Sequence, residues 1–118
     1  MFATYFPALF EEYAETLHSV HEDNLLLHLL FDSGIWPALS VNFPPNAYCH
    51  VHTNTGNKAN GMCPVFLLGD FNATKGSHLW LSNLKLIIEF PPSCLIFIPF
   101  TSLCYRNIPV TKNEVRTS

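Results

Sequence analysis

Three polar residues alternate along one short stretch of the sequence, and their types are those that bind metal ions. His50, His52 and Asn54 are separated by single residues. If this stretch is extended, the three side chains point to the same face of a strand. A histidine followed two positions later by an oxygen donor is how a site with two histidines and one carboxylate begins, with the third ligand coming from a distant strand. The spacing alone also fits a polar strand end that binds nothing.

The other histidines offer alternatives. His50 could itself serve as a metal ligand, because it shares the predicted strand face with His52. His78 could approach the same site, although a packed or solvent-facing histidine at a strand start is the alternative interpretation. His18 and His21 lie three residues apart in a predicted helix and can share a face. We expect both on the surface.

The cysteines favour an intracellular protein with reduced thiols. No pair among them has the Cys-x-x-Cys spacing of a zinc ribbon. The N-terminus has no basic segment followed by an apolar run, so we expect no signal peptide and a nuclear or cytoplasmic location. Cys94 and Cys104 are expected in the core. No apolar run reaches the roughly 20 residues that a membrane span needs.

Length and composition fit one folded domain over residues 1–118, with a helical part at 6–31 and a β-rich part at 38–118. Charged residues make up 13% of the chain and apolar residues 48%, which argues against disorder. The net charge is −3, with only 6 lysines and arginines. Composition therefore gives no independent support for tight nucleic-acid binding.

Helical periodicity is confined to the first part of the chain. Pro7 suits the first turn of a helix, because its missing N–H needs no partner there. Apolar residues then recur at helical spacing, which predicts an amphipathic helix ending near His21. We expect residues 24–31 to continue as a short helix with buried leucines at Leu25, Leu26, Leu27, Leu29 and Leu30. Asp32-Ser33-Gly34 interrupts the pattern.

Short strands and turns follow. The predicted strands are Ala38–Phe43, Ala47–His52, Cys63–Leu68, His78–Leu81, Leu84–Phe90 and Leu95–Ile98. Proline pairs, the polar stretch Gly69–Lys75 and the link Ser82-Asn83 separate them. Serial short strands of this kind indicate an antiparallel sandwich or barrel, on one face of which the preceding helices should pack. The predicted class is therefore mainly β with N-terminal helices, or α+β.

Several short motifs occur in a fixed order along the chain. The first group comprises Asn42-Phe43-Pro44-Pro45, His52-Thr53-Asn54-Thr55-Gly56-Asn57 and Asn60-Gly61-Met62-Cys63. The second comprises Leu68-Gly69-Asp70-Phe71, Lys75-Gly76-Ser77-His78-Leu79, and Leu84-Lys85-Leu86 through Phe90-Pro91-Pro92. Ile98-Pro99, Asn107-Ile108-Pro109 and Glu114-Val115-Arg116 complete the series. From about Phe6 to its end, the chain resembles the TET/JBP-like 2-oxoglutarate and iron(II) dioxygenases that are expanded, often beside transposons, in basidiomycete fungi.

The resemblance implies a fold, two cofactors and an activity. The fold is a double-stranded β-helix, also called a jelly roll. Fe(II) is held by His-x-Asp and a distal His, and 2-oxoglutarate by a basic residue soon after that His. The better-known relatives oxidise the methyl group of modified pyrimidines, methylcytosine or thymine, in DNA or RNA. The resemblance therefore also implies a nucleic-acid partner.

Residue by residue, the match includes departures. His52 matches the first iron ligand, whereas Asn54 stands where the family has Asp and Tyr105 where it has the distal His. Arg116 falls on the arginine that binds 2-oxoglutarate; the alternative is a solvated arginine at a frayed terminus. Gly76-Ser77-His78 stands where the family has Gly-Gly-His, and Pro92-Ser93 where it has Pro-Gly.

The departures weaken the expected chemistry. Asn54 keeps an oxygen donor but loses the negative charge that would offset the charge of the metal. Tyr105 binds metal well only as phenolate, which its reference pKa of about 10 opposes. Changes to residues outside the direct ligands typically lower metal affinity or activity by about 10- to 100-fold. Replacing two direct ligands should lower them further.

Three functional hypotheses follow. We expect a catalytically impaired relative of the family, such as a degenerate transposon-borne copy. The first alternative is an active oxygenase with an altered iron site, built from His52, Asn54 and either Tyr105 or His50. The second is a non-enzymatic module that binds nucleic acid or 2-oxoglutarate.

The end of the sequence carries one further expectation. A strand-like segment begins at Glu114, and the chain ends at Ser118. A barrel whose last strand is cut short leaves an unpaired edge. We therefore expect a jelly roll truncated at its C-terminus.

Overall fold

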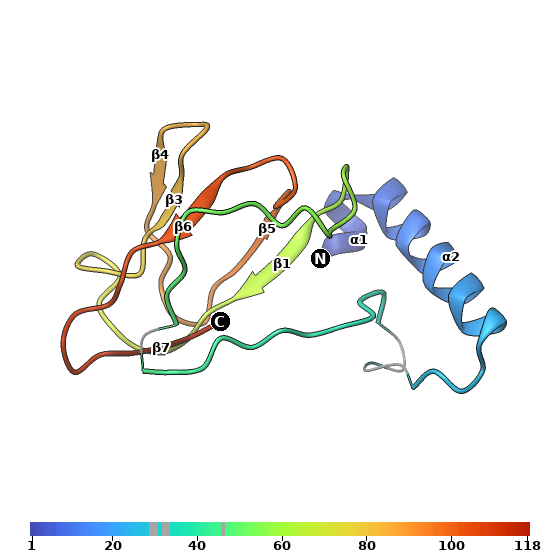
Figure 1. Cartoon of the computed structure of the whole chain (residues 1–118), viewed down its shortest axis with the longest axis horizontal. Coiled ribbons are helices and arrows are strands. Elements are labelled where there is room, and N and C mark those ends of the chain that lie inside the picture. Colours follow the sequence, from blue (N-terminus) through green and yellow to red (C-terminus); the bar gives the residue numbers. More distant parts are fainter. Residues whose placement is uncertain (29–30, 32–33, 46) are drawn as a thin grey trace. The chain divides into compact units, whose positions relative to one another are not determined.

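A computed structural model describes residues 1–28, 31, 34–45 and 47–118 of the chain (Figure 1). These residues form two compact units, Met1–Ser40 and Val41–Ser118. Helices lie in the first unit and strands in the second. The predicted single domain over 1–118 stays a prediction.

The first unit contains α1 (Phe2–Tyr5) and α2 (Pro7–Asp23). Pro7 occupies the first turn of α2, as its sequence position predicted, and the helix ends two residues beyond His21. Aromatic rings hold this unit together: the ring centroid of Phe2 lies 5.1 Å from Trp36 and 5.9 Å from Tyr13. The predicted amphipathic helix is confirmed.

The predicted second helix is wrong for the described part of 24–31. Leu25 and Leu26 form a turn, in which the Leu26 N–H donates to Asn24 Oδ1 at 3.2 Å. Asparagine competes for backbone donors in this way, which favours turns over helix. The predicted burial is also wrong, since Leu25 is 76% exposed, Leu26 89% and Leu27 42%. Leu29, Leu30, Asp32 and Ser33 lie outside the described residues.

The second unit is built from short antiparallel strands. They are β1 (Cys63–Phe66), β2 (Leu68–Asp70), β3 (Leu79–Leu81), β4 (Leu86–Ile88), β5 (Leu95–Ile98), β6 (Tyr105–Asn107) and β7 (Val115–Thr117). Strand β1 pairs with β5, β2 pairs with β7, and β3 lies between β4 and β6. The predicted mainly antiparallel β class with N-terminal helices is confirmed.

Several predicted strands differ from the observed ones. Ala38–Phe43 and Ala47–His52 are not regular strands: their backbones make only isolated pairs, such as Asn42 with Ser118 and His52 with Tyr105, which are too few to form a ladder. The predicted strand 84–90 shortens to β4, since Lys85 adopts a positive φ of 51° in the preceding turn. Sequence patterning did not predict β6.

The end of the chain is paired rather than free. Strand β7 pairs with β2, and on its other side Arg116 N–H donates to Pro45 O at 2.9 Å. Asn42 and Ser118 exchange backbone hydrogen bonds of 2.6 and 3.3 Å. The expected unpaired edge at this strand is therefore wrong.

The core of the second unit lies between these strands. It contains Leu67, Phe71, Leu79, Leu81, Phe90, Ile98, Phe100, Tyr105 and Val110. Leu67 is fully buried between β1 and β2, and Cys94 packs against this core, as predicted. In the part of the chain that the structure describes, no helix combines the length and apolarity needed to cross a membrane.

Candidate functional site

His52 and Tyr105 lie side by side although they are far apart in the sequence. Their backbones form an antiparallel bridge, with hydrogen bonds of 3.1 Å in both directions. Their rings are tilted against each other, with centroids 4.5 Å apart. The first predicted iron ligand and the residue at the distal ligand position are thus neighbours.

The ring of His52 is oriented by its own strand. Nδ1 lies 2.7 Å from the backbone carbonyl oxygen of His50, and because a carbonyl can only accept, Nδ1 carries the proton. The other nitrogen, Nε2, then has its lone pair available when the imidazole is neutral. This arrangement is typical of a metal-binding histidine.

Asn54 belongs to the same cluster. Its backbone N–H donates to the Phe100 carbonyl at 3.0 Å, and its side chain hydrogen-bonds the Tyr105 hydroxyl. The Tyr105 ring stacks on Phe100, with centroids 4.1 Å apart and planes inclined by 19°. The three predicted iron positions therefore meet at one place.

Tyr105 is a neutral phenol in this environment. Only 7% of the residue is exposed, and burial raises its pKa to about 12. Charge on the neighbouring Cys49 and Cys63 contributes to this rise of the pKa, whereas the hydrogen bond with Asn54 acts in the opposite direction. At neutral pH the phenolate that a metal would require is disfavoured even more than in water.

The donor set does not fit Fe(II). His52 supplies one suitable nitrogen, but Asn54 supplies a neutral amide and Tyr105 a protonated phenol. An iron site of this class requires two imidazoles and one carboxylate. Among the residues that the structure describes, no group of three His, Cys, Asp or Glu side chains is placed to hold a metal ion.

Arg116 is buried, with 4% of its surface exposed, so the solvated alternative is wrong. Its Nε donates to Ser77 Oγ at 2.9 Å, and one terminal nitrogen donates to the Ala47 carbonyl. No carboxylate of the described residues forms an ion pair with it. Burial lowers the pKa of the guanidinium, and the nearby Cys49 acts in the opposite direction.

A polar cluster that sequence reasoning missed surrounds Arg116. Asn107 Oδ1 accepts from the backbone N–H and from the thiol of Cys49, both at 2.7 Å, and its Nδ2 donates to the Ala47 carbonyl at 2.7 Å. Cys49 lies near both Arg116 and Tyr105, because its charge would raise the pKa of each. No spacing in the sequence signals this cluster, because its members come from three separate segments.

The alternative histidines lie in other surroundings. His50 is exposed and its Nδ1 is 3.0 Å from the Tyr48 hydroxyl. His78 is half-buried, and its carbonyl accepts from the Ile108 N–H at 2.8 Å. His18 is exposed, as predicted, and lies 3.2 Å from Glu22, whereas His21 is partly buried.

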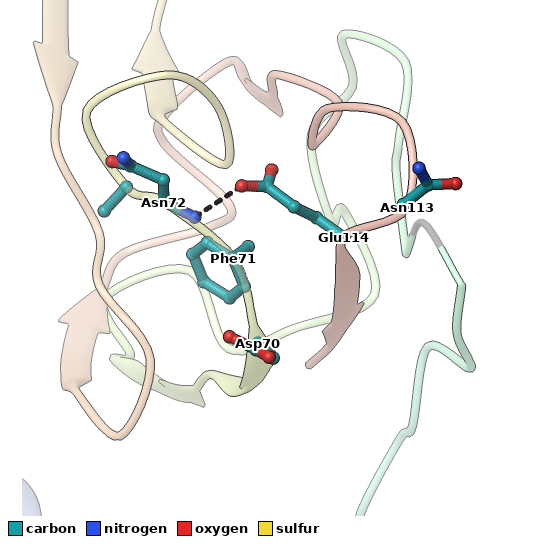
Figure 2. A pocket seen from close by; sticks show the side chains of 6 residues that line it. Asp70, Phe71, Asn72, Asn113 and Glu114 are labelled. Atoms are coloured by element: carbon teal, nitrogen blue, oxygen red, sulfur yellow. Dashed lines mark hydrogen bonds between the residues drawn. The ribbon is translucent and has the colours of Figure 1, made fainter.

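An open hollow occurs elsewhere in the second unit, lined by Asp70, Phe71, Asn72, Ala73, Asn113 and Glu114. Figure 2 shows Glu114 facing the backbone N–H of Asn72, which donates to it at 2.8 Å. The second carboxylate oxygen of Glu114 accepts from the Thr111 N–H at 2.9 Å. Hydrogen bonds from Thr111 and Asn72 lower the pKa of Glu114. This carboxylate joins two loops, and none of the predicted site residues lines the hollow.

Comparison with known proteins adds no relative: no protein-family model, no curated protein and no solved structure matches this chain.

Proposed function

We propose that the strand unit is a 2-oxoglutarate/Fe(II) dioxygenase-like domain, related to the TET/JBP-like oxidases of modified pyrimidines, that has lost normal iron chemistry. One observation carries this proposal. The positions that the resemblance assigns to the three iron ligands come from two distant segments, and His52, Asn54 and Tyr105 nevertheless converge. A single ion can be bound only by positions that converge in this way.

The backbone pairings support a jelly roll. The paired segments form two sets. In the first set, the order is β4, β3, β6 and then residues 47–52, which join β6 through the bridge between His52 and Tyr105. Leu67 continues the pairing of β1 with β5 through Cys94, so β1 and β2 act as one strand. The second set then runs β5, β1 with β2, β7 and residues 42–45. Apart from the hairpin of β3 and β4, consecutive segments alternate between the two sets, as a double-stranded β-helix requires.

The donor set supports impaired rather than normal turnover. The Asn54 side chain hydrogen-bonds Tyr105, and the high pKa of Tyr105 keeps its hydroxyl protonated. Of the three ligand positions, only His52 keeps a strong donor for iron. We therefore derive no catalytic step for this chain.

Restoring the ligands tests the proposal. The double variant Asn54→Asp, Tyr105→His returns both family residues to positions that already meet. We expect Fe(II) with 2-oxoglutarate to raise its melting temperature under anaerobic conditions, since ligand at 100 times its Kd adds about 2.7 kcal/mol of stability. The unaltered chain should show no shift with Fe(II).

The control adds His52→Ala to the double variant and should abolish the shift. Succinate release in air gives a second readout of the restored site. A folded double variant that neither binds Fe(II) nor turns over 2-oxoglutarate contradicts the assigned positions, because geometry and donors would then both be in place.

A second candidate function rests on Arg116. A buried guanidinium without a carboxylate partner among the described residues suits the anionic end of 2-oxoglutarate. A non-enzymatic module of this kind should be stabilised by 2-oxoglutarate alone, and Arg116→Met should remove that stabilisation. If modified DNA rather than 2-oxoglutarate stabilises the unaltered chain, the nucleic-acid form of this candidate is favoured instead.

A further inference from the structure

Strand β4 lies at an edge of its sheet. It pairs with β3 through Leu79–Ile88, Trp80–Ile87 and Leu81–Leu86, and it is the last strand in the order β4, β3, β6. Among the described residues, no segment pairs with its other side, and Figure 1 shows β4 beside β3 at the periphery of the strand unit. Such an edge presents backbone donors and acceptors that a further strand can join.

The side chains around this edge are unusually apolar for exposed positions. Leu84 is 58% exposed, Leu86 45% and Ile87 59%. Proteins normally protect an exposed edge with proline, with a bulge or with charges inside the strand. Strand β4 has no proline, no bulge and no charged residue. The nearest charged residues, Lys85 and Glu89, lie directly before and after it.

The charges select an orientation. Lys85 lies two residues before Ile87 and Glu89 two residues after it, and both are exposed. In an antiparallel pairing of two β4 strands centred on Ile87, each Lys85, in the turn directly before β4, comes opposite Glu89 of the other copy by register. In a parallel, in-register pairing, lysine would meet lysine and glutamate would meet glutamate, which is unfavourable.

Another edge strand, β5, lacks this complementarity. It pairs with β1, ends directly before Pro99 and has no charged residue within or beside it. Its first residue, Leu95, is 39% exposed, and the rest of the strand is more buried. Nothing in β5 would fix the register of a second copy.

We propose that β4 is the contact surface for a second copy of this chain. Two β4 strands pair antiparallel about a twofold axis at Ile87, and the two three-stranded sheets become one continuous sheet. A twofold contact of this kind is self-complementary, because each strand supplies both members of the ion pairs. The backbone hydrogen bonds supply the association, and the charges fix the register.

Charge reversal tests the register directly. Sedimentation equilibrium of the full chain over a concentration series should show a reversible dimer. Lys85→Glu places two pairs of like charges across the contact, and Glu89→Lys does the same, so each should raise the dimer Kd by about tenfold or more. The double variant Lys85→Glu, Glu89→Lys restores opposite charges and should recover the original Kd.

Ile87→Lys provides a second test at the axis, where two lysines would meet, and should give a monomer. All three substituted side chains are exposed, and unchanged circular dichroism spectra confirm that each variant is folded. The proposal is overturned if the unaltered chain is monomeric throughout the series. It is equally overturned if the Ile87→Lys variant still forms a dimer. The same holds if the double charge reversal does not restore the dimer Kd that each single reversal raises.

Discussion

The protonation state of Tyr105 decides whether its position can serve a metal, and it can be measured by alkaline titration. Burial raises the pKa of Tyr105 to about 12, against a reference value near 10. The folded state thus favours the protonated phenol. This contribution to stability is complete below pH 10 and is lost as the pH rises from about 10 to about 12. Its full size is on the order of 2–3 kcal/mol.

Tyr105→Phe isolates this contribution. Phenylalanine keeps the ring that stacks on Phe100 but removes the hydroxyl that titrates. At neutral pH the variant should lose about 1 kcal/mol, because the Asn54 side chain loses its partner. Above pH 10 the stability of the unaltered chain should fall faster than that of the variant, and urea unfolding at a series of pH values measures the difference.

The titration itself is read from the ultraviolet absorbance of tyrosinate. The chain has 4 tyrosines, so the difference between the unaltered chain and Tyr105→Phe reports Tyr105 alone. An apparent pKa near 12 supports the desolvated phenol. A value at or below 10 refutes it, and a phenolate ligand would then become chemically accessible.

Two further predictions concern stability. Leu67→Ala should lower the free energy of unfolding by about 2–5 kcal/mol, because Leu67 is fully buried, whereas its exposed neighbour Leu68→Ala should cost less than about 1 kcal/mol in the same urea titration. Glu114→Gln should lower the melting temperature at neutral pH, and the difference should shrink as the pH falls through and below about 4.3, since hydrogen bonding lowers the pKa of the folded carboxylate. Asp70→Asn, in the same hollow, is the control, and equal shifts in both variants would contradict this role of Glu114.

Local patterns predicted what local interactions decide. The helix from Pro7 follows from apolar spacing and from the tolerance of proline in a first turn, and both operate within a few residues. The predicted helix over the leucines at 25–27 was wrong because apolar character alone does not specify a helix. The side chain of Asn24 offered a competing hydrogen bond. Strand β6 was missed because Tyr105, Arg106 and Asn107 have no apolar alternation, and pairing with β3 decides their conformation.

The candidate site shows a different limit of sequence reasoning. His52 and Asn54 could be related to each other by strand periodicity, but their meeting with Tyr105 depends on a contact between distant segments, which only the resemblance suggested. Periodicity pointed to neither Cys49 nor Asn107, and the resemblance included Asn107 only within the motif Asn107-Ile108-Pro109, with no role at the site. Their hydrogen bonds form only because residues 47–52 run beside β6.

Burial is the property that changes the interpretation of Arg116. A charged residue two positions from the end of a chain is ordinarily solvated, and sequence alone left that possibility open. In the structure, the strand pairing of β7 on both sides carries the side chain inward, toward Ser77 and the Ala47 carbonyl. Burying a guanidinium without a counterion has a large desolvation cost, which neutral hydrogen-bond partners offset only in part. Arg116 is therefore a buried cation whose hydrogen-bond partners are neutral, whereas Tyr105 belongs to the core and lies beside the half-buried His52 and Asn54.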